Sequence, residues 1–122
     1  MATRGEKLNA ALANFKNNTD DVQDCAVVSR DGLVMASIMS RGVAEDRLGA
    51  MIAALSGLAR KSLEGFKLRD MEYTAIRGEE GYIIVISCGP EATLGITTRP
   101  DANLGMLLLG LREAAAEIED IF

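Results

Sequence analysis

The sequence lacks histidine and tryptophan, and aromatic residues make up only 4% of it. Without histidine, the general acid–base group that enzymes use most often is missing, and neither Cys25 nor Cys88 can be activated by an imidazole. The chain also lacks the Gly-x-x-x-x-Gly-Lys phosphate loop and the Gly-x-Gly-x-x-Gly dinucleotide fingerprint. We therefore predict a protein that is not an enzyme, with no catalytic residues and no bound nucleotide or other cofactor.

Residues suited to hold a metal ion are also scarce. The two cysteines, Cys25 and Cys88, lie in apolar segments that are typical of strands, and free cysteines in such segments are usually buried. Carboxylates such as Glu79 and Glu80 show no ligand-like spacing and are expected to be solvated. We predict two buried free thiols, no disulfide and no metal site.

Positive charge is in short supply, because 13 Lys and Arg residues oppose 18 Asp and Glu residues for a net charge of −5. Nucleic-acid binding needs clustered basic side chains, and an anionic membrane surface would repel this chain. No apolar run approaches the roughly 20 residues that cross a bilayer, and no apolar segment follows the polar start of the chain. These absences predict a cytoplasmic protein that neither binds nucleic acid nor inserts into a membrane.

The residues that are present suffice for a folded domain, because 48% of the 122 residues are apolar and 25% are charged. We expect one domain over residues 1–122. Periodicity and turn signals predict a helix, a two-stranded hairpin, a helix, a three-stranded meander and a helix. The expected strands cover residues 22–30, 33–40, 68–77, 82–88 and 92–98, and the helices begin near residues 3, 44 and 100. Helices on both faces of an antiparallel sheet make a three-layer α/β/α sandwich.

Three local signals support this division. Thr3 and Glu6 have the spacing of a capping box at the start of a helix. The Asp31-Gly32 pair predicts a type I′ hairpin turn, which needs positive φ at both central residues. Gly65 follows the long central helix and is placed to end it.

The central helix contains a stretch, Gly49 to Ala59, without one charged side chain. One side of it carries large apolar residues, and the opposite side carries small residues: Gly49, Ala50, Ala53 and Gly57. A helix that is apolar all round needs cover on both sides, and in so short a chain we expect the second cover to be another protein. The alternative is that the small residues pack under a loop of the same domain.

The order of elements and three stretches of sequence resemble the Roadblock family, found in dynein light chains and in prokaryotic regulators of Ras-like GTPases. The stretches are residues 27–36 in the hairpin, residues 48–58 in the central helix, and Leu94-Gly95-Ile96 followed by Asn103-Leu104-Gly105. Together they cover nearly the whole chain, from Leu8 to Ile118.

The resemblance implies a profilin-like, five-stranded antiparallel sheet in the order 2-1-5-4-3, with α-ββ-α-βββ-α connectivity. It places the first and last helices on one face and the central helix on the other. It also implies a homodimer formed through the third strand and the central helix. The interface residues that follow from this are Gly49, Ala50, Ala53, Gly57, Met71, Tyr73 and Ala75.

The resemblance implies a small Ras-like GTPase as partner, whose nucleotide cycle the dimer would modulate. Arg47, Arg60 and Lys61 flank the uncharged stretch and are the candidate partner-binding residues. An arginine could enter the GTPase site, but rim contacts are the simpler expectation, with activation by repositioning of the GTPase's own residues. Two alternatives remain open: a light-chain or scaffold subunit without effect on catalysis, and a sensor of a small ligand.

Overall fold

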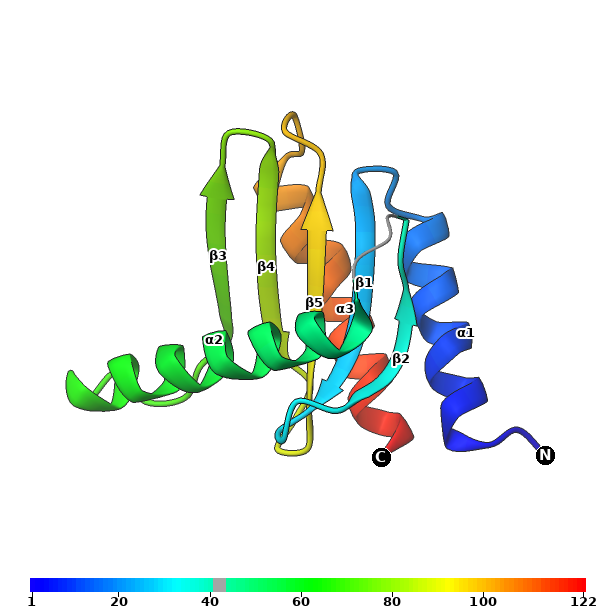
Figure 1. The fold of residues 1–122 in the computed structure, drawn as a ribbon, viewed down its shortest axis with the longest axis horizontal. Helices are drawn as coiled ribbons and strands as arrows, with labels where there is room; N and C mark the ends of the chain where they lie inside the picture. The colour runs from blue at the N-terminus through cyan, green and yellow to red at the C-terminus, as the bar shows by residue number, and fades with distance from the viewer. Residues whose placement is uncertain (41–43) are drawn as a thin grey trace.

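The computed structural model describes residues 1–40 and 44–122 of the chain. Within these residues, five strands form one sheet and three helices pack on it (Figure 1). The elements in chain order are α1 (Arg4–Asn17), β1 (Val22–Ser29), β2 (Val34–Ile38), α2 (Glu45–Gly65), β3 (Tyr73–Gly78), β4 (Gly81–Ser87), β5 (Ala92–Thr98) and α3 (Leu104–Ile121).

The sheet has the strand order β2-β1-β5-β4-β3, and every neighbouring pair is antiparallel. β1 and β5 lie inside the sheet, and both are buried over most of their length. β2 and β3 form the two edges. The predicted fold class, strand order and connectivity are confirmed.

The helices divide between the two faces of the sheet (Figure 1). α1 and α3 pack side by side on one face, where a large apolar core includes Leu8, Leu12, Leu107, Leu111 and Ile118. α2 crosses the other face alone and covers a smaller core of Ala26, Val28, Ile52, Met71 and Val85. One face of the sheet is therefore closed by two helices, and the other is only partly covered.

The capping box at the start of α1 is confirmed, because the Thr3 hydroxyl accepts from the N–H of Glu6 and the Glu6 side chain accepts from the N–H of Thr3. The hairpin turn differs from the prediction. β1 ends at Ser29, the N–H of Gly32 donates to the Ser29 carbonyl at 3.0 Å, and in this loop Gly32 alone has positive φ. A β-turn followed by a left-handed glycine is the geometry of longer hairpin loops, so the type I′ prediction is wrong.

The end of α2 also differs from the prediction. The left-handed residue after the helix is Lys67, with φ 58°, and not Gly65, which is the last helical residue. The N–H of Leu68 donates to the Leu63 carbonyl at 2.9 Å, and the N–H of Lys67 donates to the Glu64 carbonyl at 3.1 Å. This pair of bonds is the Schellman motif, which here forms around a lysine.

Two other elements begin later than predicted. β3 starts at Tyr73, so residues 68–72 precede the strand, and Met71 turns into the core beneath α2. The Glu72 carbonyl still accepts from the N–H of Ser87 in β4 at 3.1 Å. α3 starts at Leu104, because the Asn103 side chain caps it by accepting from the N–H of Met106 at 3.0 Å. Pro100 and Asp101 therefore belong to the preceding loop.

The two cysteines are buried free thiols, as predicted. Burial raises the pKa of Cys25 to about 11 and that of Cys88 to about 12. Both side chains lie in the core beneath α1 and α3, so at neutral pH they are protonated packing groups.

Candidate functional site

The central helix α2 is held on the sheet by a narrow row of residues. Gly49, Ile52 and Ser56 are buried along this row. Gly95 of β5 leaves the space that Ile52 occupies, because a Cβ at Gly95 would collide with the Ile52 side chain. The helix therefore lies close to the sheet at this point.

Gly49 packs against its own chain and not toward a partner. A Cβ at Gly49 would collide with the carbonyl oxygen of Gly32 in the β1–β2 loop and would lie 2.9 Å from Cγ2 of Val34. Ala53, half-buried, lies beside the same loop. The alternative in which small residues pack under a loop of the same domain holds at Gly49, and Gly49 is removed from the predicted interface.

Ala50 also borders the β1–β2 loop, since its Cα would lie 3.6 Å from a Cβ at Gly32, whereas Gly57 has different surroundings. Ala50 is exposed, and a Cβ at Gly57 would meet no atom of the described residues within 4 Å. The row of small residues is therefore divided, with Gly49 used for packing inside the chain and Gly57 left open.

Large apolar side chains lie along one flank of α2 and leave a groove of about 350 Å³ between the helix and the sheet. Met51 is 51% exposed and Leu58 is 66% exposed on the helix, and Ile76 of β3 is 45% exposed on the other wall. The floor comes from β4 and β5. The groove is lined by Leu48, Met51, Ile52, Ala54, Leu55, Leu58, Ile76, Ile83, Ile96 and Thr97.

The edge strand β3 borders this groove, and the C-terminal part of α2 extends past it (Figure 1). Tyr73, at the start of β3, is exposed. Ala75 is half-buried and packs against the core on the other face of the sheet. Met71 lies outside the strand and is buried beneath α2, so it is removed from the predicted interface.

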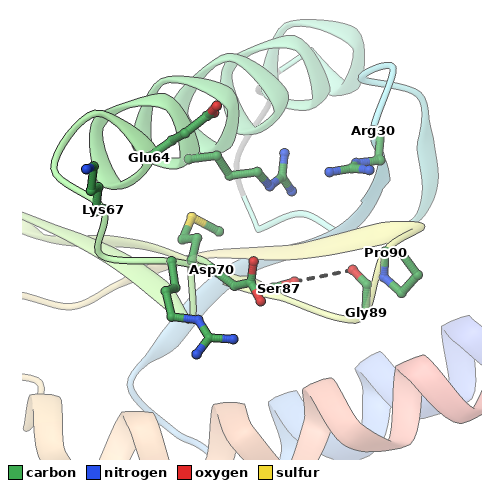
Figure 2. A pocket seen from close by; sticks show the side chains of 10 residues that line it. Arg30, Glu64, Lys67, Asp70, Ser87, Gly89 and Pro90 are labelled. Atoms are coloured by element: carbon green, nitrogen blue, oxygen red, sulfur yellow. Dashed lines mark hydrogen bonds between the residues drawn. The ribbon is translucent and has the colours of Figure 1, made fainter.

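The opposite flank of α2 carries a charged pocket of about 710 Å³. It lies between the end of α2, the β1–β2 loop and the β4–β5 loop (Figure 2). Four basic and two acidic side chains line it, together with Met71, Ser87, Gly89 and Pro90. The charged residues are Arg30, Arg60, Glu64, Lys67, Arg69 and Asp70.

Two basic residues of this pocket, Arg30 and Arg60, are close enough for the charge of one to affect the other. Partial burial, and then the positive charge of Arg30, lower the pKa of Arg60 below its ordinary value. Lys67 and Arg69 both have positive φ, 58° and 75°, which is uncommon for residues with a side chain. Among the residues that the structure describes, an ion pair joins Arg112 to Glu72, and none forms within the pocket.

The structure does not bring the predicted partner-binding residues into one cluster. Arg47 is exposed near the start of α2, and Lys61 is exposed near its end. Arg60 lines the charged pocket. Thirteen positions separate Arg47 from Arg60, which is about 20 Å along a helix. A single chain therefore presents these basic groups at two separate places.

Sequence reasoning missed Arg30, Lys67 and Arg69 as neighbours of Arg60. Arg30 lies in the hairpin loop, far in sequence from Arg60. No regular spacing of residues could therefore place the two side chains in one pocket. Over residues 1–40 and 44–122, three or more potential metal ligands nowhere come together, and none of the helices is long and apolar enough to cross a membrane.

Comparison with known proteins matches residues 8–98 of the chain to the Roadblock/LC7 domain. An uncharacterized protein of Methanocaldococcus jannaschii, MJ0714, is 35% identical over 106 residues, which cover 87% of this chain and 89% of that protein. The structure of MglB from Myxococcus xanthus has a TM-score of 0.90 at 15% identity, covering 100% of this chain and 92% of that chain. An MglB described in a tetrameric arrangement has a TM-score of 0.89 at 18% identity, covering 99% and 91%. These two structures show a common fold.

Proposed function

This chain belongs to the Roadblock/LC7 domain family, and from that membership we propose that it is a homodimeric, non-enzymatic platform that binds a small Ras-like GTPase and modulates its nucleotide cycle. The observation that carries the proposal is the extension of α2 past the edge strand β3, beside an open apolar groove. A self-associating protein, the tetrameric MglB, has the same fold.

The apolar side chains of this region are exposed in a single chain. Leu58 and Met51 on α2 and Ile76 on β3 stand around one groove, whose lining is almost free of polar side chains. Contiguous exposed apolar surface of this kind marks a binding site more often than a solvated surface. A partner that covers the groove would remove these side chains from water.

The occupant that fits is a second copy of the chain. β3 is an edge strand, and a strand edge offers unpaired N–H and C=O groups to another strand. A two-fold axis that pairs two β3 strands antiparallel also places two α2 helices antiparallel across the joint. The proposed interface contains Met51, Leu58 and Ile76 together with the predicted residues that are not fully buried: Ala50 and Tyr73, which are exposed, and Ala53, Gly57 and Ala75, which are half-buried.

The oligomeric state tests this part of the proposal. We expect wild-type protein to be a dimer by light scattering at micromolar concentration, and Leu58→Glu to be a folded monomer because the charge would be buried in the interface. The matched control is Leu109→Glu, since Leu109 is 59% exposed on α3, on the other face of the sheet. A dimeric Leu58→Glu, or a monomeric wild type, would contradict the proposed interface.

The GTPase part of the proposal rests on the resemblance to Roadblock domains that regulate Ras-like GTPases. Antiparallel α2 helices would present Arg47 of one protomer and the Arg60–Lys61 end of the other along one side of the joint. Such a dimer presents two symmetric sets of basic side chains to a partner, although within a single chain these side chains lie at two separate places. We propose regulation by repositioning of the GTPase's own residues.

Binding of a purified Ras-like GTPase from the same organism tests this part. Capture that depends on a GTP analogue and fails with GDP would support a regulator, and nucleotide-independent capture would instead favour a scaffold subunit. Single-turnover GTP hydrolysis then separates the two routes of activation. Loss of an inserted arginine lowers such a rate by roughly 10³-fold or more, whereas repositioning predicts only a small loss for Arg47→Ala and Arg60→Ala.

A further inference from the structure

The charged pocket beside α2 has properties that the proposed function does not use. It lies on the opposite flank of the helix from the apolar groove, and the two sites share no lining residue. Its volume of about 710 Å³ falls within the range of small-molecule sites, roughly 300–1,000 Å³. It is therefore large enough to hold a metabolite.

The pocket gathers positive charge on a negative protein. Four of its six charged side chains are basic, while the whole chain has a net charge of −5. The basic side chains come from three separate segments: Arg30 from the β1–β2 loop, Arg60 from α2, and Lys67 and Arg69 from the segment after it. Figure 2 shows Arg30 reaching into the pocket from the side opposite Lys67.

Two of these cations are neighbours in the pocket. Arg30 and Arg60 line the same pocket, and partial burial, to which the positive charge of Arg30 adds, lowers the pKa of Arg60. No carboxylate of the described residues is paired with either guanidinium. Like charges held together in this way are relieved by an anion placed between them.

We propose that the pocket is a binding site for a small phosphomonoester, with the phosphate held between Arg30 and Arg60. A phosphomonoester carries a charge of about −1.5 to −2 at neutral pH, which matches the excess of two positive charges, whereas a carboxylate supplies one. Two guanidinium groups donate in the planar geometry that suits phosphate oxygens.

The remaining lining residues define the rest of the ligand. Met71 and Pro90 offer an apolar surface to a short carbon chain, and Glu64 and Asp70 are acceptors that suit hydroxyl or ammonium groups. The same two carboxylates would repel a second phosphate. We therefore expect compact hydroxylated or aminated phosphomonoesters and no polyphosphate.

Phosphate titration of the purified, isotope-labelled chain tests the site. At constant ionic strength set with chloride, inorganic phosphate should shift the NMR signals of the Arg30 and Arg60 guanidinium groups and of the Gly89 amide. Glycerol phosphate should bind more tightly than inorganic phosphate, because the pocket has room for the carbon chain. Equal shifts with chloride, tighter binding of inorganic phosphate than of glycerol phosphate, or equally tight binding of acetate would each overturn the assignment.

Two substitutions and a matched control sharpen the test. Arg60→Gln and Arg30→Gln should each weaken phosphate binding about tenfold, whereas Arg99→Gln, which removes an exposed arginine outside the pocket, should change it less than about twofold. Without phosphate, Arg60→Gln should melt at the same temperature as the wild type or higher, because a repulsion is removed. An Arg99→Gln variant as weak as Arg60→Gln would refute the site.

The proposed dimer and the proposed phosphate site can be tested independently of each other. Phosphate binding is measured without a partner and can be repeated on the monomeric Leu58→Glu variant, whose substitution lies in the groove on the other flank. Retained phosphate binding there shows a site within one chain. Lost binding in a folded Leu58→Glu monomer would contradict the pocket as described.

Discussion

The two faces of the sheet are covered to different extents. Against one face, α1 and α3 enclose a core that includes fully buried leucines such as Leu12 and Leu111, and both cysteines. Against the other face, α2 alone encloses a smaller core, and two open sites remain along its flanks. A single helix is too narrow to cover five strands, so its flanks stay accessible. The closed face stabilises the fold, and the half-covered face carries the two sites that we propose for binding.

The largest contrast should come from removing one leucine on each face. Leu111→Ala should lower the free energy of unfolding by about 3–4 kcal/mol, because Leu111 is 0% exposed and its loss leaves a cavity. Leu58→Ala should cost less than about 1 kcal/mol in dilute solution, because Leu58 is largely exposed. Urea unfolding of both variants measures the difference. Equal losses in the free energy of unfolding would contradict the different roles given to the two faces.

The two thiols buried on the closed face should make the free energy of unfolding fall in alkaline solution. The thiols of Cys25 and Cys88 have pKa values raised by burial from 9.0 to about 11 and about 12. As the pH rises past 9, the unfolded chain therefore loses these protons first, and the free energy of unfolding falls until the pH passes the folded values. At about pH 10 the expected loss for the two thiols together is about 3 kcal/mol.

Urea unfolding at about pH 8 and about pH 10 measures this loss. The control is the double variant Cys25→Ala/Cys88→Ala, which retains the tyrosines and lysines that also titrate in this range. Its stability should change much less between the two pH values than that of the wild type. An equal change in both proteins would show that the thiols do not contribute.

Two glycines of α2 test how the half-covered face is packed. Gly49→Ala should destabilise the protein by about 1–3 kcal/mol, because its Cβ would collide with the Gly32 backbone. Gly57→Ala should stabilise the isolated chain by about 0.5–1 kcal/mol, since it gains helix propensity in open space. Thermal unfolding of the two variants shows whether each substitution raises or lowers the stability. If Gly57→Ala also weakens the proposed dimer, close packing of two helices at Gly57 is supported.

The smallest expected effect concerns a polar group beneath α2. Ser56 is buried, and its hydroxyl has no hydrogen-bond partner among the described residues. Ser56→Ala should therefore raise the free energy of unfolding by about 0.5–1 kcal/mol, because a desolvated hydroxyl is removed. Ser62→Ala is the comparison, since the Ser62 hydroxyl is exposed and donates to the Leu58 carbonyl at 2.8 Å. A loss of stability in Ser56→Ala would indicate that the Ser56 hydroxyl forms a hydrogen bond, and would contradict this prediction.

Much of the fold was predictable because its signals are local. The capping box of Thr3 and Glu6 depends on residues three positions apart, and the apolar run of residues 82–88 predicts an inner strand, which is buried at Ile84, Val85 and Ile86. β5 has the predicted bounds, Ala92–Thr98. The errors fall where a local signal competes with tertiary contacts, as at Met71, which leaves the strand pattern to fill the core beneath α2.

The candidate sites were less predictable than the fold. Along α2 both sides are free of charge between Gly49 and Ala59, so the helical pattern could not say which side meets the sheet. The structure places Gly49 against Gly32 and leaves Leu58 exposed. The charged pocket brings together Arg30 from a loop and Arg60 from a helix. The periodicity of the sequence carries no information on such a pair.

The sequence by itself determined the kinds and order of the elements, the burial of the two thiols and the presence of an uncharged central helix, because each depends on neighbouring residues. Only the tertiary structure decided how that helix is rotated and what lies on either side of it. The physical reason is close packing: a glycine that lets backbone approach backbone, as Gly49 does at Gly32, selects one rotation among several of similar hydrophobicity. That rotation places the apolar groove on one flank of α2 and the basic pocket on the other.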